Sequence, residues 1–298
     1  MTIVTLVLPD FLLIALGWAL LHMLKYRAEF FSTAERLVYY ILFPALLFSS
    51  IVKAPLSIAE ASTLIGATAA LMGGGVALAW LAAPVLRPDP MIHASLAQCA
   101  YRFNTYIGLS LSLSLAGTTG QSIMAVIVGC AVPLANIAAV SGLARRQNTR
   151  VSGELVRNPL ILGTVAGLTC NLMGLEPPGF VMDTLGRLGA CALALGLICV
   201  GATLSIQGLG PAAKVMGWMI VVRLLAMPVV ALVIAAVLPL SALEKQMLLL
   251  FSTLPTASST YILAVRMGGD GRSVAVTMSV GTILSGLTIP LWMHFSPF

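Results

Sequence analysis

Two long apolar segments each carry polar side chains near their middle, and these side chains have the clearest chemical potential in the chain. In one segment Arg102, Asn104 and Thr105 stand close together. In the other, Pro255 is followed by a hydroxyl-rich run made of Thr256, Ser258, Ser259 and Thr260. Arginine forms forked hydrogen bonds with carboxylates, and amide and hydroxyl groups add further hydrogen bonds. These residue types are suited to binding the carboxylate of a small organic anion.

The spacing of the two groups predicts a pair of interrupted helices. Asn104 and Pro255 are 151 residues apart, and each lies near the middle of its apolar segment. Proline removes an amide donor and clashes with the preceding turn, so a break or kink is expected at Pro255. Single prolines and single polar residues also occur in membrane helices that bind nothing. The matched pair favours a transporter site, where the positive N-terminal ends of half-helices attract an anion.

The composition places the elements that carry these residues in a membrane. Hydrophobic residues make up 59% of the 298 residues and charged residues only 9%, and the mean hydropathy is +1.02. A soluble domain needs more charge to cover its surface. Patterns of alternating strands are missing, so an all-α membrane protein is expected instead of a barrel. Ten transmembrane helices of roughly 20 residues fit the apolar runs. They cover residues 3–24, 34–53, 58–83, 92–115, 121–143, 156–175, 181–205, 212–237, 243–266 and 272–295.

Lysine and arginine predict the orientation of these spans. One set of hinges carries eleven basic residues, which are Lys25, Arg27, Arg36, Arg87, Arg145, Arg146, Arg150, Arg157, Lys214, Arg266 and Arg272. The opposite set carries three, which are Lys53, Arg187 and Lys245. Since basic loops stay in the cytoplasm, the first set is expected there, with both termini outside. The basic residues are spread over short hinges, which argues against a nucleic-acid partner.

The chain also resembles two copies of one unit, residues 1–146 and 147–298. Pro9 and Gly17 recur as Pro159 and Gly167 with the same spacing. A second set, Gly117, Gly120 and Ser122, recurs as Gly268, Gly271 and Ser273. Chance is the alternative, because glycine and proline are common in membrane helices. Five helices per copy would make the second copy enter from the opposite side, which predicts an inverted repeat.

Arg102 and Arg223 lie deep inside predicted spans, and Asp10 lies early in the first span. Arg102 is expected either to bind a substrate carboxylate, or to pair with a backbone carbonyl or extend toward the cytoplasmic side, and both interpretations stand. Arg223 is interpreted as a brace for helix packing. Asp10 is either a counter-ion or a residue of the outer interface. The five cysteines lie in apolar runs without metal-binding spacing, so we expect no disulfide, no metal site and no cofactor.

Several motifs resemble the auxin efflux carrier family, and the resemblance covers nearly the whole chain. They are the stretch Leu37 to Ser50 with Pro44, Asn158 to Ile161, Gly201 to Leu204, Arg223 to Pro228, Pro255, and Thr282 to Trp292. By position, Asn104 and Pro255 match the family's crossover residues. The chain departs from the family at Ser110, near which a proline is usual. It also lacks the long cytoplasmic loop of plant carriers, which argues against auxin as the substrate.

The resemblance implies ten helices in two inverted repeats, with broken helices 4 and 9 crossing each other. Helices 1, 2, 6 and 7 would form a scaffold that dimerises, and helices 3–5 and 8–10 a moving transport domain. It implies a multi-pass protein of the cytoplasmic (inner) membrane, surrounded by lipid, that carries organic anions such as malate or malonate in bacteria.

We therefore expect a secondary carrier of a small organic anion with an elevator-type mechanism, and no enzyme. The expected substrate-binding residues are Arg102, Asn104, Thr105, Pro255, Thr256, Ser258 and Ser259. A sodium-coupled symporter of the bile-acid type is one alternative, although membrane carboxylates that could bind sodium are scarce. An intramembrane enzyme is another, disfavoured because paired acidic, HExxH and GxSxG motifs are missing. A channel is disfavoured because charged pore rings are missing.

Overall fold

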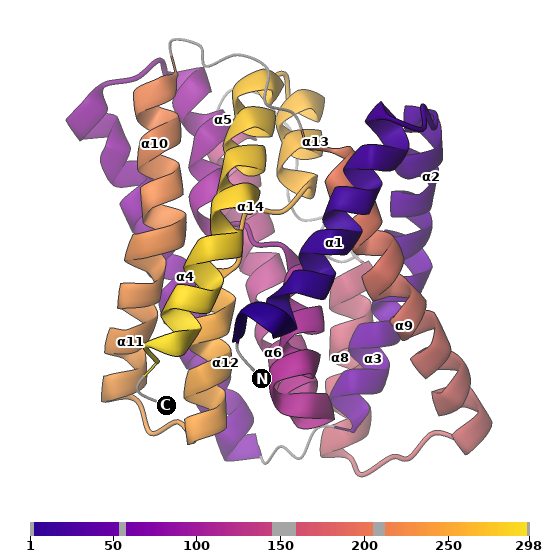
Figure 1. Cartoon of the computed structure of the whole chain (residues 1–298). Helices are drawn as coiled ribbons and strands as arrows, with labels where there is room; N and C mark the ends of the chain where they lie inside the picture. The colour runs from indigo at the N-terminus through magenta and orange to yellow at the C-terminus, as the bar shows by residue number, and fades with distance from the viewer. Residues whose placement is uncertain (1–2, 54–57, 145–158, 205–211, 297–298) are drawn as a thin grey trace.

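The computed structural model describes residues 3–53, 58–144, 159–204 and 212–296, and every regular element in these ranges is a helix (Figure 1). The expected repeat boundary at residues 146 and 147 lies outside the described residues, as do Arg145, Arg146, Arg150, Arg157 and Asn158. In chain order the helices are α1 (Ile3–His22), α2 (Ala28–Leu37), η1 (Val38–Leu42), α3 (Phe43–Val52), α4 (Ile58–Leu86), α5 (Pro90–Tyr101), α6 (Thr105–Ala144), α8 (Pro159–Leu172), α9 (Gly179–Ala202), α10 (Ala213–Val221), η2 (Val222–Ala226), α11 (Met227–Val237), α12 (Ala242–Thr253), α13 (Ser259–Arg266) and α14 (Gly271–His294).

The lengths and compositions of these helices fit a multi-pass membrane protein. Within the described residues, six helical stretches are long and apolar enough to cross a bilayer. They are Ala28–Val52, Ser62–Leu86, Pro90–Leu143, Gly179–Ala202, Ala213–Val237 and Gly271–His294. Two shorter apolar helices, Leu8–His22 and Pro159–Leu172, accompany them. Large apolar side chains stay exposed on the outside, as Leu287 does with 71% of its surface, which suits contact with lipid. The predicted all-helical membrane class is confirmed.

Glycine contacts hold together one group of helices, α1, α2, α3, α8 and α9, on the right of Figure 1. A Cβ atom on Gly201 of α9 would overlap the carbonyl of Ile14 in α1. A Cβ atom on Gly163 of α8 would lie 2.9 Å from the carbonyl oxygen of Pro44 in α3. Small residues at such points let membrane helices pack backbone to backbone. We call these five helices, together with η1, the glycine-packed group.

The remaining helices form a second group. In Figure 1, α4, α10, α11 and α12 lie on the left, and α5, α6 and α14 lie between them and the glycine-packed group. Side-chain caps begin several of these helices. Asp89 accepts hydrogen bonds from the amides of Met91 and Ile92 at the start of α5. Ser241 and Glu244 form a capping box at the start of α12. We call this second set the outer group, and its buried seam with the first carries the residues described below.

Proline explains the two π-helical turns. Both η1 and η2 come directly before a helix with proline in its first turn, Pro44 in α3 and Pro228 in α11. Proline has no amide hydrogen and its ring crowds the preceding turn, so the helix widens there instead of breaking. One consequence is that η2 turns Arg223 into the protein interior, where its side chain is 1% exposed.

A turn inside α6 separates two helical segments, 105–115 and 118–144. Ala116 and Gly117 leave the helical conformation, and Gly117 has a φ of 62°. Such a positive φ suits glycine because it has no Cβ atom. Gly268, between α13 and α14, has a φ of 63° and makes the corresponding turn in the second half of the chain. The turn at Gly117 agrees with the expected end of one span near residue 115 and the start of another near residue 121.

Candidate functional site

Two interruptions in the outer group lie in direct contact. Between α5 and α6, residues 102–104 are not helical, and between α12 and α13 residues 254–258 are not helical. The backbone amide of Asn104 donates a hydrogen bond of 2.8 Å to the carbonyl of Pro255. The expected interruptions near Asn104 and Pro255 are therefore present, and they meet. We call residues 102–104 and 254–258 the paired interruptions.

The interruption at Pro255 follows from the restrictions that proline imposes. Leu254 has φ −62° and ψ 142°, an extended conformation that residues before proline prefer. Arg223 occupies the resulting end of α12. Its Nη2 atom donates to the carbonyl of Phe251 at 2.9 Å, and its Nε atom donates to the carbonyl of Leu254. A cation is favourable at a helix C-terminus, where carbonyls lack intrahelical partners. The interpretation of Arg223 as a packing brace is confirmed.

The interruption at Asn104 arises from capping, without proline or glycine. The Oδ1 atom of Asn104 accepts hydrogen bonds from the amides of Tyr106 at 3.1 Å and Ile107 at 3.2 Å, so Asn104 is the N-cap of α6. Across the interruption, Thr256 donates its hydroxyl to the carbonyl of Cys99 at 2.7 Å, near the end of α5. These side chains thus satisfy backbone amides and a backbone carbonyl, groups for which lipid offers no hydrogen-bond partner.

Hydrogen-bond donors remain unpaired at the same place. Arg102 donates from Nη2 to the hydroxyl oxygen of Ser259 at 3.1 Å, but its buried Nη1 has no partner. The Nδ2 atom of Asn104 and the hydroxyl of Thr260 are buried without partners as well. A buried donor without a partner is costly, so such a concentration indicates a place suited to an acceptor. The carbonyl pairing considered for Arg102 is not what the structure has, because its bonded partner is Ser259.

The second half-helix begins without a side-chain cap. Ser258 is the N-cap of α13, yet its side chain makes no capping bond. Its hydroxyl instead donates to Oε1 of Glu35 in α2 at 3.0 Å. Glu35 is half-buried and belongs to the glycine-packed group, so this bond crosses the seam between the two groups. Sequence reasoning missed Glu35, although a carboxylate at the edge of an apolar span was a usable signal.

Tyr106 is a further residue at this seam that the sequence analysis did not identify. Its ring packs edge to face on Phe43 of α3, with ring centroids 5.0 Å apart. The same ring lies against Gly196 of α9, where a Cβ atom would collide with it. Thr105, which was expected to bind substrate, begins α6 and is half-buried. At the seam, the Tyr106 ring of the outer group therefore packs into the space left by Gly196 in the glycine-packed group.

Asp10 also lies in this seam and not at an outer interface. Its side chain is 4% exposed, and Oδ1 accepts a 2.7 Å hydrogen bond from the hydroxyl of Ser110 in α6. The second carboxylate oxygen, Oδ2, is buried without a partner. The auxin efflux carrier family usually has a proline near the position of Ser110. In this chain the serine found there supplies the hydrogen-bond partner of the buried Asp10 carboxylate.

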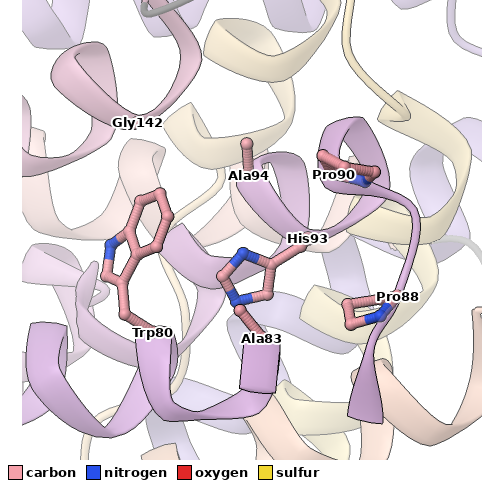
Figure 2. Close-up of a pocket in the computed structure, with 7 residues that line it drawn as sticks. All are labelled: Trp80, Ala83, Pro88, Pro90, His93, Ala94 and Gly142. Atoms are coloured by element: carbon pink, nitrogen blue, oxygen red, sulfur yellow. The ribbon is translucent and has the colours of Figure 1, made fainter. Parts of the chain in front are cut away.

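A cavity of about 420 Å³ opens elsewhere, where α4, α5 and α6 meet. Figure 2 shows the rings of Trp80 and His93 facing it, and Pro88, Pro90 and Gly142 complete much of its wall. His93 Nε2 lies 3.1 Å from the carbonyl oxygen of Ala79, so the ring is held in place. None of the expected substrate-binding residues lines this cavity. Within the described ranges, no group of three or more His, Cys, Asp or Glu side chains is placed to hold a metal ion.

Comparisons with known proteins point to membrane transport. Residues 143–293 match the model of a family described as membrane transport protein. An uncharacterized transporter of Methanothermobacter thermautotrophicus is 26% identical over 299 aligned residues, which cover 96% of each chain. A putative malonate transporter of Rhizobium meliloti is 24% identical over 296 residues, covering 95% of this chain and 92% of that protein.

Proposed function

Since this chain belongs to the auxin efflux carrier family of membrane transport proteins, we propose that it is a secondary carrier of a small organic anion, bound through its carboxylate at the paired interruptions. The observation that carries the proposal is the set of buried donors without partners, Nη1 of Arg102 and Nδ2 of Asn104, beside the uncapped start of α13. Charge-assisted hydrogen bonds from these donors and the positive helix end both favour an anion.

We assign five of the expected site residues to two roles. Arg102, Asn104 and Ser259 contact the anion, since each has a polar group at or directly next to the paired interruptions that caps no helix. Pro255 and Thr256 hold the two interruptions in register, through the bonds to Asn104 and Cys99. Binding residues must be held rigidly to gain affinity, so this second role is as necessary as the first.

We propose further that the chain has ten spans in two inverted five-helix repeats. Support comes from corresponding features about 150 residues apart. Gly117 and Gly268 both have a positive φ, and Asn104 and Pro255 both lie at an interruption. In addition, α1 packs on α9 while its counterpart α8 packs on α3, the exchange that an inverted repeat produces. In Figure 1, α1 begins and α14 ends at the same end of the bundle, which agrees with an even number of spans.

An elevator movement would then shift the outer group along the glycine-packed group, which serves as the scaffold and as the surface of a homodimer. The seam suits such a movement, because small residues such as Gly196 and Gly129 line it and few bonds cross it. We place the basic hinges in the cytoplasm and both termini outside the cytoplasmic membrane, in accordance with the bias in Lys and Arg.

A binding screen tests the proposal directly. Purified protein in detergent is heated with acetate, malonate, succinate, malate or chloride, and carboxylates that bind should raise the unfolding temperature. At a ligand concentration of 100 times Kd the folded state gains about 2.7 kcal/mol, which is easily detected. Arg102→Gln should lose the shift while unfolding normally without ligand. Absence of a shift with every carboxylate, together with no uptake of radiolabelled malonate by proteoliposomes, would refute the proposal. Repeating uptake with sodium or potassium salts distinguishes the sodium-coupled alternative.

A further inference from the structure

Glu35 brings a carboxylate from the glycine-packed group to the paired interruptions. Its Oε1 atom accepts the 3.0 Å hydrogen bond from Ser258, a residue 223 positions later in the chain. Ser258 is buried, and Glu35 is half-buried. The bond joins two groups of helices that the proposed transport cycle moves relative to each other. Any such movement must break it.

The position of this bond matters more than its strength. A serine at an N-cap ordinarily accepts a hydrogen bond from the first turn of its own helix. Ser258 makes no such bond at the start of α13, and its hydroxyl is directed to Glu35 instead. The Glu35 carboxylate therefore lies beside the positive end of α13, where anions are stabilised. The adjacent residue, Ser259, is bonded to Arg102.

Among the residues that the structure describes, the titratable groups that interact electrostatically with Glu35 are weaker acids. From α6 the phenol of Tyr106 and from α9 the thiol of Cys199 lie close enough to feel its charge. Cys199 is further directed toward the carbonyl of Phe31, at 3.8 Å. Tyr39 of η1 lies within electrostatic reach of both Tyr106 and Arg102. Tyrosine and cysteine ordinarily titrate well above neutral pH and carboxylic acids below it, so Glu35 is the one of these groups suited to exchange a proton.

We propose that Glu35 is the proton-binding site of the carrier, and that its protonation accompanies binding of the substrate anion. Ionised Glu35 accepts the Ser258 hydroxyl and occupies the positive end of α13. When Glu35 takes one proton from the solvent, its charge is lost, Ser258 is released, and the substrate carboxylate takes the place of Glu35 at the start of α13. No covalent bond of the substrate changes. This inference rests on the proposed function, because it assigns the coupling ion of the same site.

The proposal predicts the sign of the pH dependence. Because the anion binds to the protonated form, binding takes up a proton, and the apparent Kd rises with pH while Glu35 is ionised in the free protein. Linkage sets the limit at about a tenfold rise in Kd for each pH unit. By reciprocity the bound anion promotes protonation of Glu35 by the same factor.

The experiment measures malonate binding to the purified full-length protein by calorimetry between about pH 5 and pH 8. Repeating each titration in two buffers of different ionisation enthalpy gives the number of protons taken up. Malonate also titrates in this range, so each variant is compared with wild type under identical conditions. Glu35→Gln mimics the protonated form, and we expect it to bind malonate with no proton uptake beyond that of malonate itself. Glu29→Gln, an exposed position on the same helix, should behave as wild type.

The outcomes separate this inference from the proposed function. If wild type binds none of the carboxylates at any pH, the proposed function fails. If wild type binds malonate but Glu35→Gln keeps the same proton uptake, or folds yet does not bind, the assignment of Glu35 alone is overturned. Should Glu35→Gln fail to fold, Glu35→Asp and Ser258→Ala replace it. Glu35→Asp should keep proton uptake on malonate binding, but at a shifted pH. Ser258→Ala should change the pH range of proton uptake. If both variants show the pH dependence of wild type, the assignment is overturned.

Discussion

The amide of Asn104 donates to the carbonyl of Pro255 across 2.8 Å, although the two residues stand 151 positions apart. Each member of the pair marks the place where a helix stops inside the apolar layer. Their bond satisfies the carbonyl of Pro255, which lies in a segment that is not helical. The position of the candidate site therefore depends on a contact between the two halves of the chain.

Replacements at Asn104 separate capping from ligand binding. Asn104→Ser and Asn104→Asp keep an oxygen that caps α6 but remove the Nδ2 donor, so both should lose carboxylate binding and keep their unfolding temperature. Asn104→Ala removes cap and donor together and should also lose about 1 kcal/mol of stability. Thermal unfolding in detergent and malonate uptake by proteoliposomes measure the two effects. Wild-type uptake by Asn104→Ser would show that Nδ2 does not contact the substrate.

Removing the brace at Arg223 should destabilise the protein without a direct effect on charge selectivity. Arg223→Met leaves the carbonyls of Phe251 and Leu254 without these donors in the interior, which should cost about 2–4 kcal/mol. Arg223→Lys should recover part of the loss, because one ammonium reaches fewer acceptors. Lys214→Met, on the exposed surface of the preceding helix, serves as the control and should unfold like wild type. Equal unfolding temperatures for Arg223→Met and wild type would contradict the bracing role.

Two glycines of α9 should respond oppositely to alanine. In Gly201→Ala the new methyl group would overlap the backbone of Ile14, so α1 and α9 must separate and the unfolding temperature should fall. In Gly186→Ala the new methyl group meets nothing within 4 Å, and the unfolding temperature should stay the same or rise. The comparison is matched because both sites lie on one helix and gain one methyl group. Similar behaviour of the two variants would mean that the close contact contributes little.

Asp10 and Ser110 should be energetically coupled. Ser110→Ala removes the described partner of a buried carboxylate, at a cost of about 1–3 kcal/mol. Asp10→Asn in the same background should recover much of that loss, since a neutral amide is less costly to bury. A double-mutant cycle from thermal unfolding measures the coupling. Ser112→Ala is the control, because that hydroxyl donates to the carbonyl of Leu109 in its own helix. Additive effects of the Asp10 and Ser110 replacements would rule out the coupling.

Local chemistry explains which parts of the site sequence reasoning could find. Pro255 alone predicts a helix interruption, because the loss of an amide donor does not depend on tertiary context. Arg223 could be assigned to packing because a buried arginine needs acceptors, and the end of a broken helix offers them. The break at Asn104 was inferred from its distance to Pro255 and from the family resemblance. Its actual cause is an N-cap, which a sequence scan for helix breakers inside a span does not seek.

By itself, the sequence determined that the chain is a bundle of apolar helices, that two of them are interrupted, and that donors gather at the interruptions. These properties are set by composition and by residues acting on their own backbone. Tertiary structure alone decided that Ser258 meets Glu35, that Ser110 meets Asp10, and that Thr256 serves the backbone. The physical reason is that a hydroxyl takes whichever acceptor lies within about 3 Å. In this protein those acceptors come from helices far away in the chain.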